Sequence, residues 1–417
     1  MKSADSPRND MENAESMQLA ALMGQNPASL PENAATESAA MDAMAAGVPL
    51  RLQSLDVFRG VTVAFMLLVN NPGNWDNIYA PLEHSEWNGC TPTDLVYPFF
   101  LFIIGVSSVF SLSRIKENPA EANRIVRKIL RRGLTLFLIG IFLSLFPFFD
   151  FRTLRIMGVL QRIALVYTGA SLLFIYLNKK QLLYTGVALL IGYYLLMVAG
   201  PLLLTGSYSL APGQNVSALI DRAILTNAHM WKPAKTWDPE GLTGTIPAIA
   251  SALIGIMAGG ILYNKEWTGE EKVIRLFTIA FGLIVSGLLA GLAFPINKSL
   301  WTSSFVLYAG GIAMAFLAMF YYLIDLRKRN KGLTFFKIFG MNAIVAFTLS
   351  GLIPRIINNL PLIRTDDKTV TVTTVIYDTL NEVISPKNAS LGYALVNVGF
   401  YFTILAVLYT RKIFIKV

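Results

Sequence analysis

Long apolar runs alternate with shorter polar segments along most of this chain. A helix needs about 20 apolar residues to cross the hydrocarbon core of a membrane, and the runs after residue 50 approach that length. This pattern predicts an all-α, polytopic membrane helix bundle of about ten transmembrane helices. We expect these spans near residues 55–70, 95–113, 133–149, 156–177, 182–204, 245–263, 273–294, 302–324, 335–354 and 390–410.

The first 50 residues do not follow this pattern. They are rich in Ala, Met, Asn, Ser and Glu, carry seven acidic residues against two basic ones, and hold no apolar run long enough for a signal-peptide core. Such a composition is typical of segments that do not form a packed core. We therefore predict a disordered cytoplasmic tail over residues 1–50 and a membrane domain over residues 51–417 that carries the chemistry.

Composition and charge agree with a membrane protein. Hydrophobic residues make up 54% of the chain and charged residues only 15%, against about a quarter charged in soluble proteins. The net charge of +9 comes from basic residues in alternate loops, which the positive-inside rule places in the cytoplasm. We therefore expect both termini in the cytoplasm, lipid as the surroundings and no nucleic-acid partner. With one cysteine and two histidines in the chain, we expect no disulfide and no metal site.

The polar loop between the first two expected spans, residues 70–91, has an unusual content. It holds His84 and the only cysteine, Cys90, together with several amide, acidic and aromatic residues, but no Lys or Arg. The positive-inside rule therefore places it on the side opposite the cytoplasm. A histidine titrates near neutral pH and suits a general base, while an asparagine amide can donate to a developing oxyanion. This loop is our candidate for the reactive centre.

Seven short segments resemble the heparan-α-glucosaminide N-acetyltransferases and their bacterial NagX-type relatives. They occur in the family's order and span residues 51–417. The most specific is the block H-x-x-W-N-G-x-x-x-x-D-L-V-x-P when it is followed later by DPEG. The matching segments are SLDVFRG (54–60), VNN (69–71), HSEWNGCTPTDLVYPFFLFIIG (84–105), LRIMGVLQRIA (154–164), IDR (220–222), DPEGLTGTI (238–246) and GMNAI (340–344).

The resemblance implies an acyltransferase that works across a membrane. Acetyl-CoA would be supplied from the cytosol, and the acceptor would be the amine of a glucosamine-type sugar on the periplasmic side of a bacterial inner membrane. The family's catalytic histidine matches His84, and its assisting asparagine matches Asn70, with Asn71 as the alternative by register. The exact sugar is left open, as is the oligomeric state, a homodimer included.

Several charged residues in or near the expected spans could have either a structural role or a role in the site. Asp94 opens the second span, where the helix dipole favours a carboxylate, or it orients His84. Asp56 and Arg59 share a helix face, as a packing pair or as part of the CoA entrance. Arg162 should face the bundle interior, because lipid exposure of a charge is costly, and it is a candidate to line the site.

Residues in the outer loops and in the first long basic segment also have two possible roles, one structural and one in binding a substrate. Asp238 and Glu240 either cap a helix or hold the sugar, and Trp87 either belongs to an interfacial aromatic belt or stacks on the sugar ring. Cys90 could relay the acetyl group, although no neighbour clearly activates its thiol. The basic segment either reports topology alone or binds the phosphates of CoA. Its candidate residues are Arg124, Arg127, Lys128, Arg131 and Arg132.

The rival function is a transporter of amino sugars or similar polar solutes. It would use the same charged passage but would need no CoA and would cleave no thioester.

Overall fold

Helices make up nearly all of the regular structure in this computed structural model, which describes residues 52–116, 122–359, 363–364 and 369–415. The prediction of an all-α membrane bundle is confirmed. The predicted tail, residues 1–50, lies outside the described residues. The helices are α3 (Gln53–Val69), α4 (Val96–Lys116), α5 (Ala122–Leu145), α6 (Val159–Tyr176), α7 (Lys179–Tyr194), α8 (Gly200–Thr205), α9 (Val216–Leu225), α10 (Leu242–Tyr263), α11 (Gly269–Ala290), α12 (Ser303–Phe320), α13 (Thr334–Met341), α14 (Ala343–Asn359), α15 (Val372–Asn381) and α16 (Pro386–Thr410).

Each of the ten expected spans falls on helical structure, with residues 335–354 divided between α13 and α14, but fewer helices meet the criteria for crossing a membrane. Seven described helices are long and apolar enough, and an eighth counts if the bent pair α13–α14 is taken as one span. The helix α3 has only 17 residues, and α5 begins with a strongly basic stretch. The count of ten spans and the cytoplasmic placement of both termini therefore stay predictions.

Three segments between the expected spans are partly helical, and the one over residues 205–244 contains α9. The basic residues before the third span were expected in a loop, yet α5 begins at Ala122 and carries them on its first turns. Hydropathy missed this start because these turns are amphipathic. Residues 355–389 contain the end of α14, the two-residue strands β1 (Ile363–Arg364) and β2 (Thr369–Val370), which pair antiparallel, and the helix α15.

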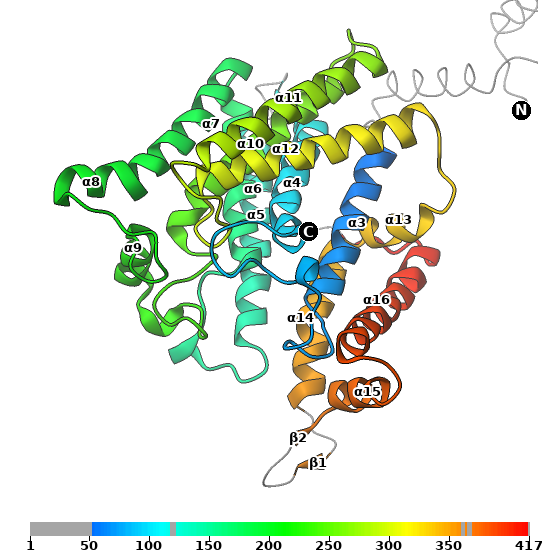
Figure 1. Ribbon diagram of the computed structural model, residues 1–417. Coiled ribbons are helices and arrows are strands. Elements are labelled where there is room, and N and C mark those ends of the chain that lie inside the picture. Colours follow the sequence, from blue (N-terminus) through cyan, green and yellow to red (C-terminus); the bar gives the residue numbers. More distant parts are fainter. Residues whose placement is uncertain (1–51, 117–121, 360–362, 365–368, 416–417) are drawn as a thin grey trace, which may run out of the picture. The chain divides into compact units, whose positions relative to one another are not determined.

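The centre of the helical unit is the crossing of α4 and α10, which lie beside each other with α6 and α12 in Figure 1. Small residues make this crossing close. A Cβ added at Gly105 would lie 2.0 Å from the carbonyl oxygen of Ala252, and one added at Gly255 would lie 2.1 Å from that of Phe102. Such contacts drive helix association in membranes, where no hydrophobic effect acts between helices. Most of α10 is buried, whereas α7 and α11 are largely exposed on the outside and suit contact with lipid.

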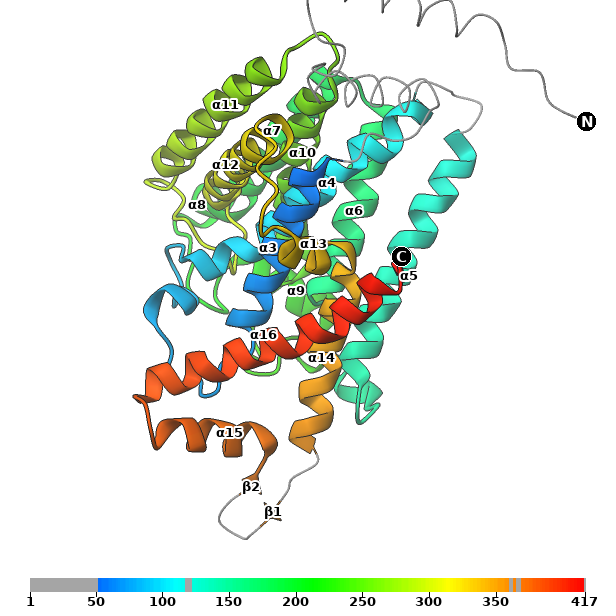
Figure 2. The ribbon, with the colours of Figure 1, turned by 90° about the vertical axis from the view of Figure 1, so that its right-hand side faces the viewer.

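A second group of helices forms around α3. Figure 2 shows α3 next to α13, with α16 crossing below them and α14 continuing toward α15. The helices α13 and α14 meet at an angle of 77° at Asn342. The buried amide of Asn342 donates to the carbonyl of Ile413 and accepts from the backbone N–H of Ile415, at 3.1 Å each. These bonds tie the break to the segment after α16.

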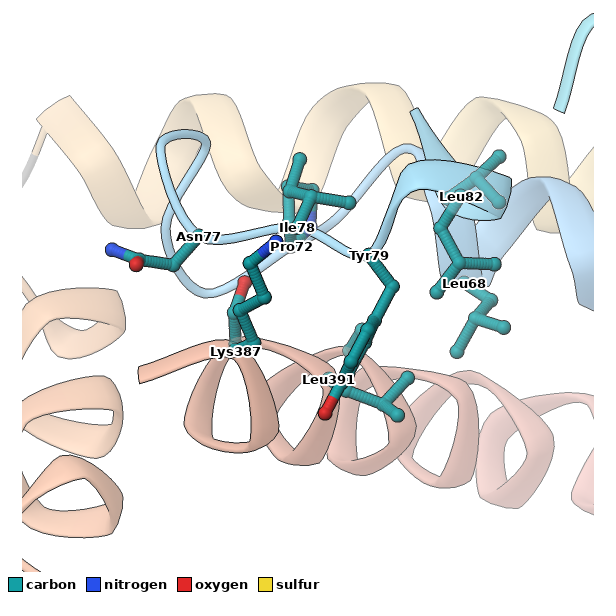
Figure 3. Close-up of a pocket in the computed structure, with 11 residues that line it drawn as sticks. Leu68, Pro72, Asn77, Ile78, Tyr79, Leu82, Lys387 and Leu391 are labelled. Atoms are coloured by element: carbon teal, nitrogen blue, oxygen red, sulfur yellow. The ribbon is translucent and has the colours of Figure 1, made fainter. Parts of the chain in front are cut away.

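The first polar loop, residues 70–91, is fixed to the start of α16. Figure 3 shows Tyr79 reaching down onto this helix between Lys387 and Leu391. The Tyr79 hydroxyl donates to Asn388 over 2.7 Å, and the backbone N–H of Gly73 donates to the carbonyl of Ser390 over 3.2 Å. A loop anchored in this way can hold its reactive side chains in defined positions.

Candidate active site

A cavity of about 1370 Å³ runs through the helical unit between α3, α4, α5, α6, α13 and α14. Ligand pockets in proteins usually measure about 300–1,000 Å³, so this one could take a large substrate or two substrates together. Its wall follows α4 from Val96 to Leu112. At 1.5 Å per residue these positions are about 24 Å apart, most of the roughly 30 Å hydrocarbon thickness of a bilayer.

The two ends of the cavity differ in chemistry. We call one the histidine end, and its polar lining residues include Asn70, His84, Thr93, Glu240 and Lys298. We call the other the basic end, and its lining residues include Arg59, Arg124, Arg127, Lys128, Arg131 and Arg132.

At the histidine end, His84 is bound to the buried carboxylate of Asp94. Nδ1 of His84 lies 2.7 Å from Oδ1 of Asp94, while about half of the His84 side chain is exposed. An ionised carboxylate only accepts hydrogen bonds, so Nδ1 carries the hydrogen and Nε2 keeps the lone pair. The imidazole is therefore oriented with Nε2 as its basic nitrogen, as a general base requires.

Asp94 itself is held in place by its own helix start. Its Oδ2 atom accepts from the backbone N–H of Ser85, the backbone N–H of Thr91 and the Thr91 hydroxyl, at 3.0–3.1 Å. Thr91 and Asp94 form a capping box at the 3₁₀ turn Pro92–Leu95, which leads into α4. One carboxylate oxygen of Asp94 thus caps the helix and the other contacts His84, and a role for Asp94 in the reaction stays a prediction.

Lys298 is a second polar neighbour of His84, and the sequence had not singled it out. Its Nζ lies 3.1 Å from Nδ1 and 3.4 Å from Nε2 of His84, and 3.6 Å from Oδ1 of Asp94. Only 18% of the Lys298 side chain is exposed. Burial lowers the pKa of Lys298, and the negative charges of Asp94 and Glu240 oppose this effect.

Lys298 reaches His84 because two loops are joined. The backbone N–H of Gly89 donates to the carbonyl of Ile296 over 2.7 Å, and the Asn297 amide donates to Asn88 over 3.2 Å. Gly89 has a φ of +110°, a backbone conformation that residues other than glycine rarely adopt. The contact of Lys298 with His84 thus depends on the pairing of segments that lie far apart in the sequence.

A buried ionic cluster borders the histidine end. Arg155 donates from Nε to Asp238 over 2.9 Å and also binds Glu240 through Nη2. The positive charge of Arg155 counters burial and holds the pKa of Glu240 below its ordinary value, while burial raises the pKa of Asp238. Of the two carboxylates only Glu240 lines the cavity, with Asp238 behind it.

Arg162 lies within the bundle, as expected, but behind the cavity wall. Its Nη2 donates to the carbonyl of Gly241 over 2.9 Å, and its guanidinium lies 5.2 Å from the ring centre of Trp301. Its Nε and Nη1 atoms have no hydrogen-bond partner in the described part of the chain. Arg162 therefore stabilises the turn before α10 through its hydrogen bond to Gly241.

At the basic end, all five candidate residues of α5 line the cavity. They lie on exposed turns of the helix, and the guanidinium of Arg132 stacks 4.8 Å from the ring centre of Tyr167. From α3, Arg59 lines the cavity, pairs with Asp56 at 3.3 Å and donates to the Ser107 hydroxyl over 3.0 Å. Asp56 does not itself line the cavity. Clustered guanidinium and ammonium groups are the chemistry that proteins use for phosphate.

Other candidate residues lie beside the cavity rather than in its wall. Asn71 follows the end of α3 and its amide donates back to the carbonyl of Leu67 over 2.8 Å, whereas Asn70 caps α3 and lines the cavity. The Trp87 indole donates to the carbonyl of Leu210 over 3.0 Å and packs edge-on against Trp237. The part that each plays in a reaction stays a prediction.

Comparison with known proteins identifies the family. The family model described as the catalytic part of heparan-alpha-glucosaminide N-acetyltransferase matches residues 51–282. The chain belongs to this family.

Two curated relatives carry the same name. The heparan-alpha-glucosaminide N-acetyltransferase of Homo sapiens is 28% identical over 357 residues, which cover 72% of this chain and 52% of the human protein. That of Mus musculus is 28% identical over 353 residues, covering 71% of this chain and 53% of its own length. The chain thus spans about half the length of the curated relatives it matches. The resemblance to the heparan-alpha-glucosaminide N-acetyltransferase family is confirmed, and the bacterial NagX-type subgroup stays a prediction.

Within this family's matched region the structure adds Arg155 to the residues expected at the site, and beyond it adds Lys298. Arg155 stands in the motif LRIMGVLQRIA but had been given no role of its own. A signal for Lys298 was present, because it is a lone lysine in a short loop predicted to face away from the cytoplasm. Among the described residues, no group of three or more His, Cys, Asp and Glu side chains is placed to hold a metal ion.

Proposed function

We propose that the protein transfers an acetyl group from cytosolic acetyl-CoA to the amine of a glucosamine-type sugar on the periplasmic side of a bacterial inner membrane. The observation that carries this proposal is one cavity with a histidine–aspartate pair at one end and a phosphate-binding type of surface at the other. Membership of an acetyltransferase family supports it independently.

The donor would enter at the basic end. Its phosphates would bind among Arg124, Arg127, Lys128, Arg131 and Arg132, with Arg59 further along the wall. The long pantetheine arm is mostly apolar, and the wall between the two ends contains aliphatic and aromatic residues such as Ile103, Ile104 and Phe347. The thioester would then reach the histidine end while the nucleotide stays at the rim.

At the histidine end, His84 would act as the general base. Nε2 of His84 takes a proton from the acceptor amine as its nitrogen attacks the thioester carbonyl. The nitrogen–carbon bond forms, the carbon–sulfur bond breaks, and the proton passes to the leaving thiolate of CoA. Asn70 lines the same end and would donate its amide N–H to the oxyanion that develops on the carbonyl, a contribution of about 10²–10³ in rate for one such donor.

The acceptor would be held mainly by Glu240, which is the one carboxylate lining this end in the described part of the chain. Burial keeps its surroundings poor in water, and Arg155 keeps it ionised, so it suits an ammonium or a sugar hydroxyl. Asp238 and Arg162 would hold this turn from behind. Trp87 and Asn71 would act from the neighbouring loop, by packing rather than by direct contact with the reacting atoms.

A direct transfer is favoured over a relay through Cys90. Burial and the charge of Asp94 raise the pKa of the Cys90 thiol to about 12. The thiolate is the nucleophile in thiol chemistry, so a thiol with this pKa is a poor acetyl carrier near neutral pH. Cys90 is also not one of the residues that line the cavity.

The proposal is tested by thiol release from acetyl-CoA with the purified full chain in nanodiscs, with and without glucosamine. We expect glucosamine-dependent release that falls by about 10²–10⁴-fold in His84→Ala. His229→Ala is the matched control, because the His229 ring donates from Nδ1 to the carbonyl of Leu154 over 2.8 Å and lies outside the cavity wall. If folded protein releases no thiol with any amino sugar tried, the proposal of an enzyme is overturned and the transporter remains as the alternative function.

A further inference from the structure

The side chain of Lys298 meets His84 and Asp94 at the same time. Its Nζ lies within 3.4 Å of both ring nitrogens and 3.6 Å from the Asp94 carboxylate. Asp94 is fully buried, and its other oxygen is already saturated by Ser85 and Thr91. A buried carboxylate is costly unless it is paired with a positive charge. Only His84 and Lys298 form ion pairs with Asp94 among the described residues, so one of the two must supply that charge.

Building on the proposed acetyl transfer, we infer that Lys298 is a positioning residue that supplies the positive charge for Asp94 and thereby keeps His84 neutral and able to accept a proton. Without this ammonium group, the carboxylate would draw a second proton onto the imidazole. A protonated imidazole has no lone pair and cannot serve as the base.

The distances determine the size of the effect. Two positive charges about 3.3 Å apart repel by an amount worth on the order of one pH unit even in a water-like medium, and by more in a partly buried site. The other charged group that faces Lys298 within the cavity wall is Glu240. The thiol of Cys90 stays neutral, and Glu83 and Glu86 are exposed in the first polar loop. None of these groups replaces a cation at His84.

The head group of Lys298 is not needed to build its loop. The loop over residues 291–302 is held by Asn297, which accepts from the backbone N–H of Leu300 over 2.8 Å, and by Thr302, which binds the carbonyl of Pro295 over 2.9 Å. The backbone bond from Gly89 to Ile296 joins this loop to the first polar loop. Removing the ammonium should therefore change the charge at His84 and leave the loop in place.

The test uses nuclear magnetic resonance on the full chain with ¹³C-labelled histidine in nanodiscs. The protein has only two histidines, so His84 and His229 give two ring signals, which His229→Gln assigns. In Lys298→Met we expect the His84 signal to titrate at a pH at least about one unit higher than in the unaltered protein. Lys298→Arg, which keeps the charge, should stay close to the unaltered protein, and the His229 signal should not move in any variant.

An unchanged or lower titration pH for His84 in Lys298→Met would overturn the inference, since it would mean that Lys298 carries no charge that matters to the imidazole. If the His229 signal moves as well, Lys298→Met has disturbed the structure. Lys298→Gln is then used in its place, because the polar glutamine side chain suits the partly exposed site. The measurement needs no turnover and thus stands apart from the test of acetyl transfer. Where turnover is found, the acid limb of its pH profile should move up by the same amount in Lys298→Met.

Discussion

Asp94 and His84 are joined side chain to side chain over 2.7 Å, although one begins a membrane helix and the other lies ten residues earlier in a polar loop. The same carboxylate also receives three hydrogen bonds from that loop and its cap. The orientation of the imidazole is therefore built into the start of α4, and it should persist whether or not substrates are bound.

Replacing Asp94 by Asn should lower the turnover number by roughly 10- to 100-fold. The three donors at Oδ2 would hold the amide oxygen, so the amide NH₂ would face Nδ1 and the imidazole would lose the acceptor that fixes its tautomer. The KM for acetyl-CoA should change little, since the basic end is untouched. Steady-state kinetics of thiol release measure both. Asp150→Asn is the control, because Asp150 caps an exposed turn away from the cavity. A variant with normal turnover would show that Asp94 is only a helix cap.

Removing one basic residue of α5 should weaken binding of the donor. A hydrogen bond to a charged group is worth about 1.5–3 kcal/mol, so the KM for acetyl-CoA should rise by roughly 10- to 100-fold in the variant that loses a phosphate ligand. Arg124, Arg127, Lys128, Arg131 and Arg132 would be changed to Gln one at a time. Arg329→Gln is the control, an exposed basic residue outside the cavity wall.

Acetyl-dephospho-CoA sharpens this experiment. It lacks the 3′-phosphate, so the residue that binds this phosphate should have a large effect with acetyl-CoA and little effect with the dephospho compound. If each of the five variants raises the KM equally with both donors, the basic residues of α5 bind the other phosphates of CoA. If no variant changes the KM, these residues have only a topological role.

Cys90→Ser should retain at least about half of the activity, because thiol chemistry needs a thiolate that Cys90 does not provide near neutral pH. The raised pKa of about 12 also has a direct readout. An ordinary thiol becomes reactive as the pH rises through about 8.5, whereas Cys90 should react only slowly with iodoacetamide up to pH 9. Mass spectrometry follows the alkylation. Fast labelling together with an inactive serine variant would restore the acetyl relay.

Gly255→Ala should destabilise the protein, because the added Cβ would lie 2.1 Å from the carbonyl oxygen of Phe102. Overpacking of this kind costs about 1–3 kcal/mol, and helices in contact through backbone atoms have little room to yield. Gly260→Ala in the same helix is the control, since nothing lies within 4 Å of its added Cβ. Thermal unfolding in detergent compares the two, and equal midpoints would show that α4 and α10 are packed less closely than described.

Apolar runs in the sequence located the long apolar helices, because a membrane span depends on composition over about 20 residues, but they did not indicate α9, α15 or the break between α13 and α14. They failed at α5, where the charged turns of an amphipathic helix resemble a loop. The pairing of His84 with Asp94 could be foreseen as one of two readings, since both belong to one short motif. The approach of Lys298 could not, because it depends on two loops that meet across 214 residues of chain.

The wall of the cavity includes residues from almost the whole length of the membrane domain, from Arg59 in α3 to Ile415 after α16. The segment that holds Ile415 is also the one tied to Asn342 at the helix break. During synthesis the first helices would enter the bilayer well before this segment leaves the ribosome. An unfinished chain therefore has no closed wall, so the cavity could be completed only after α16 has been inserted.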